Sequence, residues 1–86
     1  MKNTETPPSA RVIFGQNVRR VRRLKEMSQE ELAFRADISR TYLSEVERGE
    51  RNISVDNMEA LAFALEMELP DLMRLRLLSL PSEESR

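Results

Sequence analysis

The chain has 86 residues and contains neither cysteine nor histidine, which excludes disulfides, thiolate metal sites and the side chain that most often acts as a general base or metal ligand. Its formal net charge is −1, but residues 10–27 carry six lysine or arginine residues against one glutamate, whereas residues 53–86 carry three arginines against seven acidic residues. Because the local field decides how a charged partner approaches, this polarity favours a nucleic-acid partner at the basic end.

The two ends of the chain, residues 1–9 and 81–86, are expected to be disordered arms that flank one domain over residues 10–80. The first ten residues are polar, unlike a signal peptide, and the longest apolar run, residues 60–65, is far too short to cross a bilayer. We therefore expect a cytoplasmic protein without membrane contact. No stretch alternates with the period of a strand, so we predict an all-α fold.

Helical signals begin directly after the first arm. Apolar residues spaced mostly three or four apart predict a first helix over residues 9–26, with Ser9 at its start. Ser28 opens a capping box and predicts a second helix that ends near Asp37. Ser39 is the expected N-cap of a third helix, so only a tight turn separates the second helix from the third.

The remaining signals predict two more helices. Gly49 is expected to end the third helix, because glycine readily adopts the left-handed conformation after a last turn. Ser54 caps a fourth helix, in which apolar residues recur at three and four. Pro70 stands where a first-turn proline is favoured and predicts a fifth helix over residues 70–80. Together these helices predict a compact five-helix domain.

Residues 28–49 form two short helices joined by a tight turn, which is the plan of the DNA-binding helix-turn-helix. Their sequence, Ser28-Gln29-Glu30-Glu31-Leu32-Ala33 followed by Ile38-Ser39-Arg40-Thr41-Tyr42-Leu43-Ser44-Glu45-Val46-Glu47-Arg48-Gly49, resembles the phage repressor/Cro-like family, also called XRE-like. The likeness covers about residues 14–72 and implies a repressor-like DNA-binding domain. Within the family, the start of the third helix and the loop of residues 51–54 are most similar to controller proteins of restriction–modification systems, which are small autoregulatory dimers.

The start and one side of the third helix are the part that enters the major groove in such motifs. Arg40 can donate two hydrogen bonds to guanine, and Thr41 can contact a base edge, although a solvated surface is the alternative interpretation for both. Glu45 aligns with a base-reading position of phage repressors, but it is equally suited to orienting Arg48 or Arg40. The ring of Tyr42 can close the core, and its hydroxyl can reach a phosphate.

Phosphate contacts are expected on both sides of the third helix. Gln29 lies in the first turn of the second helix, where free backbone N–H groups favour an anion, and the resemblance implies a phosphate contact there. Arg48, Arg51 and Asn52 follow the third helix and would bind the backbone of the same half-site. The complete candidate DNA-binding set is Gln29, Ser39, Arg40, Thr41, Tyr42, Ser44, Glu45, Arg48, Arg51 and Asn52.

Two further positions have a structural interpretation. The resemblance implies that Arg22 and Glu47 form a buried ion pair between the first helix and the end of the third. Asp37 stands where the family usually has glycine, and aspartate tolerates a positive φ better than most residues. The other arginines of the first helix either raise the local potential near DNA, which we favour, or form a solvated face; they are Arg19, Arg20 and Arg23.

The last third of the chain has more apolar residues than one small core requires. Phe63 falls where the family usually has a polar residue, and an aromatic residue on a helix surface is more often an interface than an accident. We therefore predict a homodimer contact at the acidic end, away from the DNA. Its expected residues are Phe63, Met67, Leu69, Met73, Leu75 and Leu78.

These features predict a transcription regulator that binds an inverted-repeat operator as a homodimer and regulates its own expression, because no sensor region is evident. The expected partners are double-stranded operator DNA and a second copy of the chain, with RNA polymerase as a further candidate. The alternative is an antitoxin-like interaction module that also binds DNA, but the tail is too short to favour it. No catalytic residue, cofactor or metal site is expected, because the chain lacks a phosphate loop and a metal-ligand cluster.

Overall fold

The computed structural model describes residues 8–75, which contain five helices and no strand. The helices are α1 (Ala10–Leu24), α2 (Gln29–Ala36), α3 (Arg40–Glu47), α4 (Val55–Ala64) and α5 (Leu69–Leu72). The predicted all-α, five-helix class is therefore confirmed for this part of the chain. Most of the first predicted arm and the whole second arm lie outside the described residues. No helix over residues 8–75 has both the length and the apolar character needed to cross a membrane.

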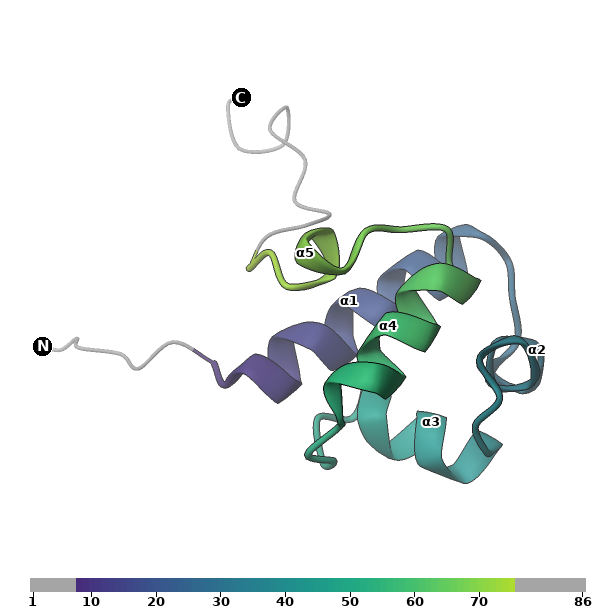
Figure 1. The fold of residues 1–86 in the computed structure, drawn as a ribbon, viewed down its shortest axis with the longest axis horizontal. Helices are drawn as coiled ribbons and strands as arrows, with labels where there is room; N and C mark the ends of the chain where they lie inside the picture. The colour runs from purple at the N-terminus through teal and green to yellow at the C-terminus, as the bar shows by residue number, and fades with distance from the viewer. Residues whose placement is uncertain (1–7, 76–86) are drawn as a thin grey trace, which may run out of the picture.

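The helices surround one core. Figure 1 shows α3 below α1 and α4, α2 to their right and α5 above them. α1 packs against α3 and α5, while α4 packs against α2 and α5. Each helix contributes at least one fully buried apolar side chain to the centre, and these are Phe14, Val18, Leu32, Leu43, Leu61, Leu65 and Leu72. Two residues of the apolar pattern, Leu24 at the end of α1 and Val55 at the start of α4, are instead exposed.

Serine residues determine where four of the helices begin. Ser9, Ser28, Ser39 and Ser54 stand at the N-caps of α1 to α4, and each hydroxyl oxygen accepts a hydrogen bond from the backbone N–H three residues later. Such a cap contributes about 1 kcal/mol to helix stability. The predicted starts of these helices are therefore confirmed.

The turns around α3 require unusual backbone conformations. Asp37, the C-cap residue after α2, has φ 61° and ψ 43°, so it adopts the positive φ that aspartate tolerates better than most residues. Gly49 follows α3 with φ 76°, as predicted. Gly15 serves a different purpose, since a Cβ atom there would stand 2.1 Å from the carbonyl oxygen of Val46. The missing side chain thus allows α1 to lie directly against the end of α3.

Two predicted helices are shorter in the structure. α1 ends at Leu24 rather than at residue 26, because Glu26 adopts a left-handed conformation with φ 58°. α5 ends at Leu72, so the prediction of a helix over residues 70–80 is wrong for residues 73–75, and residues 76–80 lie outside the described range.

The physical reason for the short α5 is a buried side chain of α1. The side-chain amide of Asn17, which is 1% exposed, donates hydrogen bonds of 2.8 Å to the carbonyl oxygens of Leu72 and Arg74. A continuing helix would have used both carbonyls for its own backbone ladder. Asn17 therefore ties the end of α5 to α1 in place of another helical turn.

Candidate nucleic-acid interface

The helix-turn-helix consists of α2, the turn of residues 37–39 and α3. Arg40 and Thr41 are the first two residues of α3, and both are exposed. Within residues 8–75, the Arg40 guanidinium takes part in no ion pair. The hydroxyl of Ser39 is engaged in capping, because it accepts a hydrogen bond of 3.0 Å from the backbone N–H of Tyr42. Arg40 and Thr41 are thus the side chains of this helix start that remain available to a ligand.

A polar hollow of about 430 Å³ opens beside the starts of α2 and α3. Its lining comes from α1, the N-terminus of α2 and the first residue of α3, and consists of Arg19, Arg22, Arg23, Ser28, Gln29, Glu30 and Arg40. The sequence favoured a role for Arg19 and Arg23 in raising the potential near DNA, with a solvated face as the alternative; in the structure both line the same hollow as Gln29 and Arg40. Their spacing of four residues puts them on one face of α1, and this signal was present in the sequence.

A buried ion pair adjoins this hollow, because Arg22 is one of the lining residues and pairs with Glu47. Arg22 and Glu47 are 8% and 4% exposed, and the Arg22 Nε and Nη2 atoms donate to the two Glu47 carboxylate oxygens over 2.7 and 3.0 Å. Arg22 also donates from Nη1 to the carbonyl oxygen of Met27, and Gln29 donates from Nε2 to Glu47 over 3.0 Å. The network connects α1, the first turn of α2 and the end of α3, and it fixes the orientation of the Gln29 amide.

Tyr42, Glu45 and Arg51 form a second cluster along α3. The Nε atom of Arg51 donates to a carboxylate oxygen of Glu45 over 2.8 Å, and its guanidinium carbon lies 4.9 Å from the centroid of the Tyr42 ring. Glu45 therefore pairs with neither Arg48 nor Arg40, which were the partners suggested by the sequence, because the loop after α3 folds back alongside the helix. The half-buried Tyr42 ring packs against the core, and its hydroxyl accepts a hydrogen bond from Asn57.

Arg48 is the C-cap residue that follows α3, and it belongs to a third cluster. It donates two hydrogen bonds, of 3.1 and 3.2 Å, to the carboxylate of Glu50 and one of 2.6 Å to the hydroxyl of Ser44. The hydrogen bonds with Glu50, aided by the Coulombic attraction, raise the pKa of Arg48 above its usual value. The hydrogen bonds from Arg48 hold the pKa of Glu50 below its usual value.

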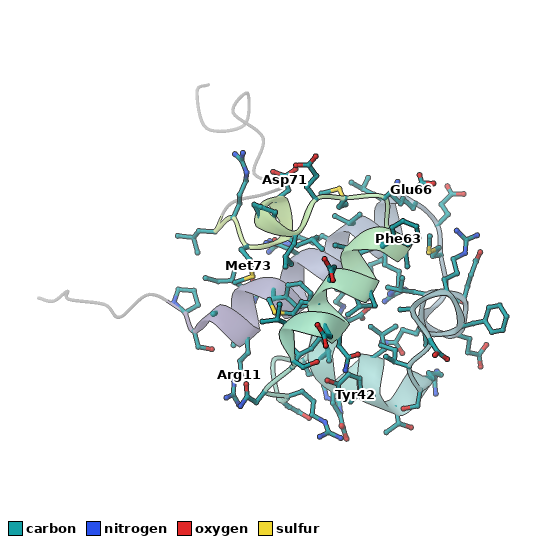
Figure 2. All side chains as sticks on the ribbon, in the orientation of Figure 1. Arg11, Tyr42, Phe63, Glu66, Asp71 and Met73 are labelled. Carbon is teal, nitrogen blue, oxygen red and sulfur yellow. The ribbon has the colours of Figure 1, made fainter. Side chains whose placement is uncertain are left out.

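The exposed Asn52 shares a hollow with Arg11, a residue that sequence reasoning missed. A second hollow of about 310 Å³ is lined by Ser9, Ala10, Arg11, Asn52, Ile53 and Met58. Figure 2 shows Arg11 on the same side of the molecule as Tyr42. Arg11 lies in the first turn of α1, where the helix dipole disfavours a positive charge, so helix stability does not explain it. The sequence signal that could have identified Arg11 was the presence of an arginine in the first turn of a predicted helix.

The opposite end of the molecule carries exposed apolar side chains together with acidic residues that pair with basic ones, Glu66 with Lys25 and Asp71 with Arg74. Figure 2 shows Phe63, Glu66 and Asp71 on the side away from Tyr42. Phe63 is 85% exposed and helps line a hollow of about 400 Å³. Among the other predicted dimer residues, Leu75 is exposed, and Leu78 lies outside the described residues. Three more are half-buried and pack against the core of their own chain, and these are Met67, Leu69 and Met73.

Comparisons with known proteins agree with this architecture. A family model described as helix-turn-helix matches residues 18–72. The control protein C.BamHI of Bacillus amyloliquefaciens is 52% identical over 64 residues, which are 73% of this chain and 79% of the relative. The control protein C.SmaI of Serratia marcescens is 41% identical over 61 residues, or 71% of this chain and 73% of the relative.

A solved structure is similar in both fold and sequence. The restriction-modification controller protein C.AhdI from Aeromonas hydrophila superimposes with a TM-score of 0.70 at 47% identity, covering 72% of this chain and 94% of that protein. The matched family consists of transcription regulators and not of enzymes. This chain therefore belongs to the helix-turn-helix family, as a transcription regulator of the controller-protein type.

Proposed function

We propose that this regulator binds an inverted-repeat DNA operator as a homodimer and thereby controls its own expression. The observation that carries the proposal is the polar hollow beside the starts of α2 and α3. Gln29 lines it together with three arginines, Arg19, Arg23 and Arg40, that form no ion pair with any other residue in the described range 8–75. One phosphate group bound there would meet the N-terminus of α2 and positive charge from two helices. The adjoining start of α3 would then face the base edges of the major groove.

We assign base contacts and phosphate contacts to different residues. Arg40 and Thr41 are exposed at the start of α3 and would contact base edges. In the loop after α3, Arg51 and Asn52 are also exposed, and Arg11 lines the same hollow as Asn52. These residues would bind the phosphates that flank the groove, which fixes the register of the protein without reading sequence.

The second copy is proposed to pack against the end of the molecule that carries Phe63. Burial of one large apolar side chain contributes about 1.5–3 kcal/mol, and a two-fold contact buries the same residue twice. Glu66 and Asp71, which pair with Lys25 and Arg74 at this end, would then lie away from the DNA. Because dimers form in proportion to the square of the monomer concentration, operator occupancy would report the amount of the protein itself. RNA polymerase is a further proposed partner, bound at a promoter next to the operator.

The dimer is tested by replacing Phe63 with glutamate. Sedimentation of the wild-type protein should show a dimer at micromolar concentration, and Phe63→Glu should sediment as a monomer, because each interface would then bury an unpaired carboxylate. Phe34→Glu is the matched control, since Phe34 is equally exposed, at 86% against 85%, but lies on α2. A wild-type protein that stays monomeric at high concentration, or a Phe34→Glu variant that dissociates to the same extent, contradicts the proposed interface.

A further inference from the structure

Two of the arginines assigned to DNA phosphates are already paired with carboxylates of the same surface. Arg51 pairs with Glu45 over 2.8 Å, and Arg48 pairs with Glu50 over 3.1 Å. All four side chains are between 30% and 56% exposed, so they are accessible to a partner that approaches this surface. Arg40, the proposed base reader, has no such partner within residues 8–75.

Such pairs reduce what an arginine contributes to DNA binding. Before Arg51 can neutralise a phosphate, it must leave Glu45, and the released carboxylate then stands close to the phosphates and repels them. Exposed ion pairs are individually weak, so a well-placed phosphate can still displace the carboxylate. The free energy lost in opening the ion pairs is therefore regained only when the protein is bound closely enough for both arginines to contact phosphates at once.

We propose that Glu45 and Glu50 are specificity-determining residues that hold Arg51 and Arg48 in ion pairs on arbitrary DNA and release them on the operator. The inference rests on the proposed function, because it requires α3 and the following loop to face DNA. On arbitrary DNA, where α3 makes no matched base contacts, the pairs stay closed and few counterions are released. On the operator, the base contacts of Arg40 hold α3 in the groove, and the pairs open toward the phosphates.

Glu45 is the more strongly placed of the two carboxylates. It is bound to a guanidinium that also lies over the Tyr42 ring, and the Tyr42 hydroxyl is in turn held by Asn57. The side chain of Glu45 is 30% exposed, whereas that of Glu50 is 56% exposed. Substitution of Glu45 is therefore the sharper test.

The experiment compares wild-type protein with Glu45→Gln on a duplex of random sequence, by fluorescence anisotropy between 50 and 200 mM salt. In Glu45→Gln, the freed Arg51 should neutralise one additional phosphate per subunit, which steepens the plot of log affinity against log salt by about 0.9 per subunit. For each subunit, the ratio of variant to wild-type affinity should therefore be about threefold larger at the low-salt end than at the high-salt end. Affinity for the operator should change less, so the ratio of operator to random-sequence affinity should fall. Glu68→Gln is the control, because it removes the same charge from an exposed residue before α5 that caps no helix through its side chain.

A double-mutant cycle with Arg51→Gln identifies the cause. If Glu45 acts by holding Arg51, the tighter binding of Glu45→Gln should vanish in the Arg51→Gln background. The proposal is overturned if the tighter binding persists there, because the carboxylate then acts through its own repulsion, or if Glu45→Gln matches Glu68→Gln. Should Arg51→Gln leave the affinity and salt slope unchanged on both duplexes, the assignment of this face to DNA would itself be wrong.

Discussion

Replacing Glu47 with glutamine is expected to lower the free energy of unfolding by about 3–5 kcal/mol, because the substitution leaves the buried Arg22 guanidinium without a compensating charge. Arg22 is 8% exposed and directs two of its donors at the Glu47 carboxylate. The third acceptor of this guanidinium is the Met27 carbonyl oxygen, which cannot neutralise it. A small domain has only about 5–15 kcal/mol of stability in total. Urea denaturation followed by circular dichroism should therefore show a large shift of the midpoint.

Two variants distinguish the stability effect of stranding a buried charge of the Arg22–Glu47 pair from the effect of merely removing one negative charge. Glu31→Gln breaks the exposed pair of Glu31 with Arg35 on α2 and should cost less than about 1 kcal/mol. The double variant Arg22→Met/Glu47→Leu removes both buried charges and should be much more stable than Glu47→Gln alone. If Glu47→Gln proves no more destabilising than Glu31→Gln, the pair does not hold α1 against α3.

Replacing Arg40 with alanine is expected to weaken operator binding by about 1–3 kcal/mol and to relax the preference at one base pair of each half-site. The reason is geometric, because Arg40 is the first residue of α3, is exposed and forms no ion pair within residues 8–75. Its guanidinium is thus free to donate two parallel hydrogen bonds to the major-groove edge of guanine. Titration of the operator and of its single-base-pair variants measures both effects.

Gln29→Ala provides the contrast, since a lost phosphate contact should weaken binding to all sequences by a similar factor. Gln29 also donates to Glu47, so the unfolding of this variant must be measured alongside its binding. If Arg40→Ala lowers affinity equally on the operator and on scrambled DNA, then Arg40 contacts phosphate only and another residue reads the base.

The parts of the fold that depend on neighbouring residues could be predicted from the sequence. A serine hydroxyl caps the backbone three residues ahead, so Ser28, Ser39 and Ser54 indicated the starts of α2, α3 and α4. The helix-turn-helix followed from the short distance between two such signals, with Asp37 taking the left-handed conformation at the turn. The candidate base readers followed in turn, because they are simply the first residues of α3.

What the sequence could not indicate depends on contacts between distant residues. The end of α5 is determined by Asn17, which lies 55 positions before its acceptor Leu72, and nothing in the local pattern of residues 70–80 reports that contact. The pairing of Glu45 with Arg51 likewise depends on how the loop after α3 folds back. The polar hollow beside α2 could be predicted only if the position of α1 against the helix-turn-helix were known. That position depends on the absence of a side chain at Gly15.

The central claim is that two copies, related by a two-fold axis, present α3 to successive major grooves on one face of the duplex. Selection of bound sites from random duplex DNA, carried out in parallel with wild-type protein and Arg40→Ala, tests this claim most directly. The wild type should select an inverted repeat whose half-sites lie about 10–10.5 bp apart, centre to centre. Arg40→Ala should select the same symmetric spacing with one base pair of each half-site relaxed. Direct repeats or isolated half-sites from the wild type would contradict the symmetric dimer.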